Sequence, residues 1–348
     1  MLEMERDVAV RLVSQAVGIG RAVQRDIARA AESGGGRWDK DDKSPVTEAD
    51  LAIQAAISVG LREAFPADPL MGEETSEELR RPDFAPLLER VVSRVRSVRA
   101  DATAANVLDW IERRGETYPA DGRYWVLDPV DGTKGFLRGE QYAIALALVV
   151  NGRVELGVLG CPNLPASLAS GGNSNEAGGL GEIAWAIRGQ GAWRMPLDSS
   201  DQPTAAARLR VADAGSDAAK TWVERVESSG RNKDVSSEIA GAAGIGRPPH
   251  RLDSQAKYAV VARGEAALYL RHTLDPAYRE KVWDHAAGAI VIEEAGGRLT
   301  DLAGRALDFS RGRELSGNRG IVATNRESHD RVLASIQQHL SAEALAAG

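Results

Sequence analysis

The chain has 348 residues, of which 43% are apolar and 27% charged, and its formal net charge is −7. This composition excludes a fibrous or intrinsically disordered protein, and the length predicts two packed subdomains rather than one. The acidic balance argues against a surface that binds a nucleic-acid polymer.

The cysteine and histidine content limits the kinds of site that the chain can build. A single cysteine, Cys161, cannot form an internal disulfide, which favours a reducing compartment. The five histidines have no spacing typical of zinc ligands, so we expect any metal site to be built from oxygen. The longest apolar run, 143–150, is far shorter than the roughly 20 residues of a membrane-spanning helix, and the acidic start does not resemble a signal peptide. We therefore expect a cytoplasmic protein that does not contact membranes.

The N-terminal region is predicted to form helices. Apolar residues recur at helical spacing from Leu12 to Ile27, until the serine and glycines of 33–36 end the pattern. A second helix is expected to begin at Thr47, where residues 47–50 form a capping-box pattern, and to end before Pro66. A third is expected near 86–98.

Strand patterns follow. Residues 124–127 predict a short buried strand, and the apolar runs 142–150 and 153–160 flank Asn151-Gly152, a pair that favours a two-residue hairpin turn. The small, polar residues 167–181 predict a loop. We place the boundary there, with residues 1–165 as an N-terminal subdomain and 182–348 as a C-terminal one.

In the C-terminal part, strands and helices alternate. Strands are expected at 182–187, 192–194, 266–271 and 320–324, and helices at 254–263, 284–295 and 326–346. The glycines around Gln190 indicate a hairpin turn rather than a dinucleotide site. Because hairpin-linked strands coexist with strand-helix-strand units, we expect layered mixed α/β sheets, not a doubly wound parallel sheet.

The densest group of reactive side chains is at 128–133. Asp128 and Asp131 end an apolar strand, a proline between them fixes the backbone, and Gly132 allows a sharp turn. Carboxylates and carbonyls, here that of Val130, are ligands that Mg²⁺ accepts. The alternative is an ordinary Asp-Pro-x-Asp-Gly turn.

Three other acidic positions each have a simple structural explanation. Asp50 could be no more than the cap of its helix, and residues 72–74 could be no more than a solvated acidic bend. Asp284 could be no more than the charge at a helix start. All three, however, stand at a helix start or beside a glycine, where the backbone can bring an acid close to a phosphate.

Together these segments resemble a known family. Residues 42–50, 72–74, 128–133 and 283–288 are similar, in the same order, to the motifs of the inositol-monophosphatase-like superfamily of metal-dependent phosphatases. Residues 134–142, 160–164 and 253–258 narrow the resemblance to the 3′(2′),5′-bisphosphate nucleotidase branch. The similarity covers roughly 40–325 and implies an αβαβα layered fold with the site between two subdomains.

The resemblance implies two or three Mg²⁺ ions and a water activated beside them. It assigns these ligands to the ions: Glu73, Asp128, the carbonyl of Val130, Asp131 and Asp284. Asp128 would bridge two ions, and Asp50 with the Thr133 hydroxyl would orient and deprotonate the water. Carboxylates this close would repel one another without cations.

The resemblance also implies the substrate contacts. Ser254, Lys257 and Arg271 would contact the nucleotide, while Thr133 and Asp284 would lie at the phosphate that is cleaved. The alternative is that the helix carrying Lys257 simply has a solvated basic face and that Arg271 ends a strand. The branch has a loop with serine and histidine upstream, whereas residues 228–234 contain no histidine; an arginine there, Arg231, could replace it.

We therefore expect a Li⁺-sensitive, Mg²⁺-dependent phosphatase that removes the 3′-phosphate of 3′-phosphoadenosine 5′-phosphate and also acts on 3′-phosphoadenosine 5′-phosphosulfate. One alternative is an inositol polyphosphate 1-phosphatase that uses the same carboxylates. Another is a catalytically silent sensor of bisphosphorylated nucleotides, although a protein that only binds does not need a water activator.

Overall fold

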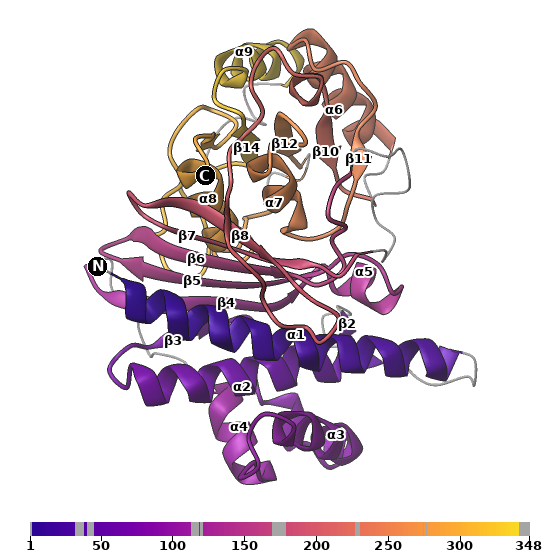
Figure 1. Ribbon diagram of the computed structural model, residues 1–348, viewed down its shortest axis with the longest axis vertical. Helices are drawn as coiled ribbons and strands as arrows, with labels where there is room; N and C mark the ends of the chain where they lie inside the picture. Colours follow the sequence, from indigo (N-terminus) through magenta and orange to yellow (C-terminus); the bar gives the residue numbers. More distant parts are fainter. Residues whose placement is uncertain are drawn as a thin grey trace.

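The computed structural model of the protein describes residues 2–31, 38–39, 45–112, 118, 121–168, 179–226, 230–273, 275 and 277–340. Over these residues the chain forms alternating layers of helices and sheets, with three helical layers enclosing two sheets (Figure 1). The predicted αβαβα arrangement is therefore confirmed. In the same described part, no helix is both long and apolar enough to cross a membrane.

The first helical layer consists of α1 (Glu3–Ala31) and α2 (Glu48–Ala64), with α3 (Ala85–Arg96) and α4 (Ala104–Glu112) packed against α2 (Figure 1). The capping box predicted for α2 is confirmed: the Thr47 side chain accepts from the Asp50 N–H, and the Asp50 carboxylate accepts from the Thr47 N–H. Helix α4 was not predicted, although Val107, Trp110 and Ile111 share one buried face.

The larger sheet has seven strands among the described residues, in the order β3-β4-β5-β6-β7-β8-β9. Their bounds are β3 (Leu70–Gly72), β4 (Arg123–Asp131), β5 (Ala143–Val150), β6 (Arg153–Cys161), β7 (Glu182–Ile187), β8 (Gly191–Pro196) and β9 (Ala207–Arg208). Of the strand pairs described in this sheet, only β3–β4 is parallel. The β5–β6 hairpin is confirmed, with φ of 52° at Asn151 and 70° at Gly152, as its turn requires.

Strand β4 is longer than predicted. It continues through Asp128 to Asp131, and its register with β5 shifts between these two residues. An irregular position of this kind accommodates a proline, which cannot donate a ladder hydrogen bond. The predicted strand ended at Leu127, whereas the sheet continues past Pro129 and carries both carboxylates.

The central helical layer holds α7 (Ala256–Ala262) and α8 (Ala286–Glu294), which contact both sheets. Gly157 of β6 is needed for this packing, because a Cβ there would lie 2.7 Å from the Ala287 carbonyl oxygen of α8. The short helix α5 (Thr133–Leu137) follows directly from β4.

The smaller sheet has five strands in the order β11-β10-β12-β14-β13 within the described ranges. These are β10 (Trp222–Glu224), β11 (His250–Arg251), β12 (Leu268–Arg271), β13 (Arg298–Thr300) and β14 (Ile321–Thr324). Strand β10 is parallel to both β11 and β12, while β14 is antiparallel to its neighbours. Helices α6 (Gly230–Ala242) and α9 (His329–His339) cover the outer face (Figure 1).

The remaining elements are short. They are β1 (Trp38–Asp39), β2 (Pro45–Val46) and the 3₁₀ turns Glu78–Arg80, Pro82–Phe84 and Ala218–Lys220. Most of the predicted loop near 167–181 and the last residues of the predicted final helix lie outside the described residues. The division into 1–165 and 182–348 stays a prediction; strands β7, β8 and β9, which follow that loop, belong to the larger sheet.

The contact between α7 and α8 gives a test of the packing. A Cβ at Gly288 would lie 2.2 Å from the buried ring of Tyr258, so Gly288→Ala is expected to lower the free energy of unfolding by about 1–3 kcal/mol through overpacking. Gly241→Ala in α6 is the matched control, because nothing lies within 4 Å of its Cβ, and it should stabilise the helix by about 0.5–1 kcal/mol. Denaturant unfolding measures both; equal effects would contradict the packing.

Candidate active site

The centre of the site is the end of β4. Asp128 is 2% exposed, and its Oδ1 has no hydrogen-bond partner among the described residues. The Oδ2 of Asp131 accepts the backbone N–H of Gln255 at 2.5 Å. A buried carboxylate oxygen without a donor is costly, and a bound cation would satisfy it.

Glu73 is placed beside Asp128 by strand β3. Its N–H donates to the Leu127 carbonyl at 3.2 Å, so Glu73 extends the parallel β3–β4 pair by one residue. The buried side chain of Gln54 fixes the next residue, Glu74, through hydrogen bonds to its N–H and its carbonyl of 2.9 and 2.7 Å. The backbone of this segment is thus fixed from α2 and is not a solvated bend.

Asp50 is a helix cap and is also close to the other acids. Its Oδ2 accepts from both the N–H and the hydroxyl of Thr47, at 2.8 and 2.6 Å. It is 1% exposed, and its charge raises the pKa of Asp128. The capping interpretation is therefore correct, yet the same carboxylate also belongs to the acidic group.

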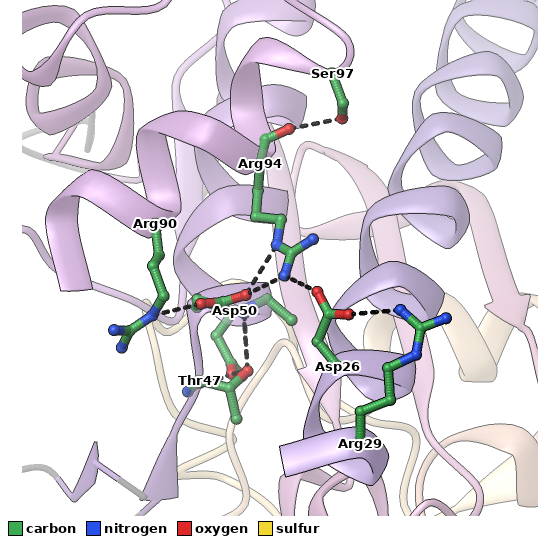
Figure 2. A network of polar contacts seen from close by, with 9 residues as sticks. Asp26, Arg29, Thr47, Asp50, Arg90, Arg94 and Ser97 are labelled. Carbon is green, nitrogen blue, oxygen red and sulfur yellow. Dashed lines mark hydrogen bonds and ion pairs between the residues drawn. The ribbon is translucent and has the colours of Figure 1, made fainter. Parts of the chain in front are cut away.

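Ion pairs hold the start of α2 against α1 and α3. Glu48 lies 2.8 Å from the guanidinium groups of both Arg90 and Arg94. Arg94 also contacts Asp26 of α1 at 2.5 Å, as Figure 2 shows beside Thr47 and Asp50. The first turn of α2 is consequently anchored from two other helices.

Asp284 lies just before α8 and contacts a buried network. Its Oδ2 is 3.3 Å from a guanidinium nitrogen of Arg271, whose Nε is 2.8 Å from Glu280. Glu280 contacts His285 Nε2 at 3.0 Å, and the other ring nitrogen is 2.8 Å from the Tyr258 hydroxyl. The ligand atoms of Glu280, Asp284 and His285 lie within 4.8 Å of one another, but Arg271 and Tyr258 already occupy the Glu280–His285 pair.

The charges at this site repel one another. Burial raises the pKa of Asp128 well above its usual value, and Glu73, Asp131, Asp284 and Asp50 raise it further. Burial and then Asp284 raise the pKa of Asp131 to about 6, although nearby cations oppose the shift. This mutual repulsion and the orphaned Asp128 oxygen fit a site that holds divalent cations.

The segment after β4 brings Thr133 next to these acids. The Thr133 hydroxyl donates to the Val130 carbonyl at 3.1 Å. Gly132 has a φ of 86°, and a Cβ there would lie 2.9 Å from the Cβ of Ser254. Only glycine allows this turn to pack against the segment that carries the predicted substrate contacts.

Lys257 is buried, as are all the residues of its helix α7, so this helix does not have the solvated basic face that was the alternative. Lys257 is 3% exposed, and its ammonium donates to the carbonyls of Ser254 and Leu252 at 2.6 and 3.2 Å. Burial lowers its pKa to about 7, although Asp131 opposes the shift. Arg263, in contrast, pairs with Glu182 and Glu265 and is a structural residue.

A cavity of about 230 Å³ brings most of the predicted residues together. Those that line it are Glu73, Asp131, Thr133, Ser254, Lys257, Arg271 and Asp284. Asp50, Asp128 and Val130 are not part of the lining. The side chain of Arg231 and residues 42–44 of the first motif lie outside the described residues.

Other residues line the cavity that the sequence did not single out for binding. They are Gly132, Lys134, Gly135, Arg225, Asp253, Gln255 and Tyr269. Lys134, Asp253 and Gln255 stand inside motifs that were already recognised, so their position was a usable signal. Arg225 follows β10, a strand that was not predicted, and only the sheet reveals its place.

The chain is similar in sequence to known proteins. Residues 2–341 match the model of the inositol monophosphatase family. A 3′(2′),5′-bisphosphate nucleotidase from Oryza sativa is 40% identical, over 99% of this chain and 96% of that protein. A protein of the same description from Emericella nidulans is 37% identical, over 97% of this chain and 99% of that protein.

Solved structures show the same fold. An inositol monophosphatase from Anabaena has a TM-score of 0.62 at 19% identity and covers 99% of both chains. An IMPase from Thermotoga maritima has a TM-score of 0.60 at 21% identity, covering 96% of this chain and 97% of that one. At these identities the likeness concerns the fold alone.

Asp131→Asn tests the electrostatics without an activity assay. The folded pKa of Asp131, about 6, lies above the ordinary 3.8, so its contribution to stability is present at low pH and is lost as the pH rises through 6. An asparagine at this position does not titrate, so the variant does not lose stability through ionisation there as the pH rises. In chelator, its unfolding free energy should therefore exceed that of the wild type by a margin that widens from pH 4 to about 6 and then stays constant.

Adding Mg²⁺ should reverse the order, because the ion stabilises the wild type more than a variant that lacks one charged ligand. Chemical denaturation with and without Mg²⁺ measures both effects. A constant margin across the pH range, or equal stabilisation by Mg²⁺, would contradict the assignment.

Proposed function

The chain belongs to the inositol monophosphatase family, and we propose that it is a Mg²⁺-dependent phosphatase that removes the 3′-phosphate of 3′-phosphoadenosine 5′-phosphate. The products are AMP and phosphate, and 3′-phosphoadenosine 5′-phosphosulfate is a second substrate. The observation that carries the proposal is that the cavity is lined by both carboxylates and cations. Glu73, Asp131 and Asp284 face it together with the cations Lys257 and Arg271. Such a cavity suits a ligand with one phosphate at a metal site and a second anionic group at the cations.

The metal ligands in this proposal are the carboxylates of the acidic group and one backbone oxygen. They are Glu73, Asp128, the Val130 carbonyl, Asp131 and Asp284. When bound, Mg²⁺ supplies charge neutralisation and a lower pKa for a coordinated water. The unpartnered oxygen of Asp128 and the raised pKa of its carboxyl both support this assignment.

Asp50 and Thr133 act on the attacking water in this proposal. The Thr133 hydroxyl, at the start of α5, orients the water, and the pair accepts its proton as the new P–O bond forms. The P–O bond to the ribose 3′-oxygen breaks, and that oxygen takes up a proton from solvent water to become the product hydroxyl, while the proton accepted from the attacking water returns to solvent. Thr47 holds Asp50 on Oδ2, which fixes the carboxylate in one orientation.

Ser254, Lys257 and Arg271 hold the phosphate that is not cleaved. The pKa of Lys257 is lowered to about 7 by burial, and an anion bound beside it would favour the charged ammonium. Arg271 is already oriented by Glu280, so little of its side-chain entropy remains to be lost on binding. Both features favour a ligand with a second phosphate over a monophosphate.

A substrate panel tests the proposal. Phosphate release is measured with 3′-phosphoadenosine 5′-phosphate, its 5′-phosphosulfate analogue, inositol 1,4-bisphosphate, inositol 1-phosphate and fructose 1,6-bisphosphate, each with Mg²⁺ and with added Li⁺. We expect the highest kcat/KM for the adenine bisphosphate and inhibition by Li⁺. A preference for inositol 1,4-bisphosphate would replace the proposal with an inositol polyphosphate 1-phosphatase, and tight binding without turnover would indicate a sensor.

The role of Thr133 is tested by Thr133→Ala, with Thr133→Ser as the control that keeps the hydroxyl. Because general-base contributions are typically about 10²–10⁴-fold, the alanine variant should lose kcat on that scale with a modest change in KM. The serine variant should retain most of the activity. Steady-state kinetics on the adenine bisphosphate distinguish the outcomes, and a loss confined to KM would mean that Thr133 only binds.

A further inference from the structure

Arg225 lies at the same edge of the smaller sheet as Arg271. Strands β10 and β12 are parallel, with Trp222 opposite Leu268 and Val223 opposite Tyr269. Continuing this register by two residues brings Arg225 opposite Arg271. Side chains two residues apart share a face, and the carboxyl ends of parallel strands are where open α/β sheets bind ligands.

The cavity confirms that this edge faces the site. Arg225 lines it together with Asp253, which follows β11, the other parallel neighbour of β10. Asp253 pairs with a different arginine, since its Oδ2 lies 2.5 Å from the guanidinium of Arg138. The neighbouring acid Glu224 is likewise engaged by Arg251 at 2.8 Å.

The charge of Arg225 therefore remains available. It is exposed and makes no ion pair within the described part of the chain, whereas Arg271 pairs with Glu280 and Asp284. Its charge also contributes to lowering the pKa of the buried Lys257, so the two cations are near each other. Like charges gathered at one end of a cavity, one of them without a carboxylate partner in the described residues, favour the binding of an anion from outside.

We propose that Arg225 is a specificity-determining residue that contacts the ligand's anionic group remote from the carboxylates, and so selects bisphosphorylated substrates over monophosphates. This rests on the proposed function for the identity of the substrate, but the contact itself requires only a second phosphate. Arg225 and Lys257 both line the cavity, but Arg225 is exposed to solvent whereas Lys257 is buried.

The test compares kcat/KM for bisphosphate and monophosphate pairs. The pairs are 3′-phosphoadenosine 5′-phosphate with adenosine 3′-phosphate, and inositol 1,4-bisphosphate with inositol 1-phosphate. Arg225→Ala should lower the bisphosphate-to-monophosphate ratio about tenfold, the lower end of the value of a charge-assisted hydrogen bond. Arg225→Lys should recover part of it, because it keeps the charge but loses the fork of donors.

Arg247→Ala is the matched control. Arg247 is an exposed arginine of the same part of the chain, pairs with Asp217 at 2.8 Å and does not line the cavity, so it changes net charge equally. The bisphosphate-to-monophosphate ratio of kcat/KM in Arg247→Ala should equal that of the wild type. An equal loss for both members of a pair in Arg225→Ala, or the same ratio in both variants, would overturn the inference.

A binding measurement separates this inference from the proposed function. Calorimetry of AMP binding in chelator measures the contribution of the remote phosphate alone. Arg225→Ala should weaken AMP binding about tenfold, while the binding of adenosine should stay the same. If the wild type cleaves inositol 1,4-bisphosphate but no nucleotide, and the Arg225 effect appears on that pair, the proposed function is wrong and the contact stands. If the wild type cleaves the adenine bisphosphate and no ratio depends on Arg225, the contact is wrong and the function stands.

Discussion

Repulsion among buried carboxylates is the constraint on which the rest of this structure depends. Asp128 is 2% exposed and has an oxygen without a partner among the described residues, and its pKa is raised first by burial and then by four other acids. Without restraint on the surrounding backbone, these carboxylates would move apart or water would enter between them. The irregular β4–β5 register and the Gln54 clamp on Glu74 hold that backbone from within the larger sheet and from α2.

The same constraint explains why ion-pair networks surround the site at a distance. Glu48 with Arg90 and Arg94 fixes the helix start that carries Asp50. On the other side, Glu280 takes one edge of Arg271, so that this guanidinium is shared between Glu280 and Asp284. Each network restrains an acid through a neighbour, which keeps the acid's remaining oxygens available.

Sequence reasoning succeeded where the signal was local. The capping box at 47–50 and the Asn151-Gly152 turn depend on adjacent residues, and the acidic motifs are short and contiguous. It failed for α6, whose weakly amphipathic sequence gives no clear helical period, and for Arg225, whose place depends on the parallel pairing of β10 with β12. The pairing register of two distant strands cannot be predicted from either segment alone. A cation such as Arg225 can therefore lie in a site although no sequence motif contains it.

The proposed metal ligands that strands bring to the cavity and the cavity's two arginines come from different sheets, and Gly132 makes one tight contact between these two parts. Carboxylates Glu73 and Asp131 follow or end strands of the larger sheet, whereas Arg225 and Arg271 belong to the smaller one. Where they meet, Gly132 packs on Ser254, which adopts a φ of 67° that costs a non-glycine residue about 1 kcal/mol. A glycine at 254 would avoid that cost. Serine is nevertheless present: it lines the cavity, its hydroxyl accepts the Ala256 N–H, and its carbonyl accepts from the Lys257 ammonium. The strained residue therefore connects the turn after the carboxylates of β4 to the buried cation.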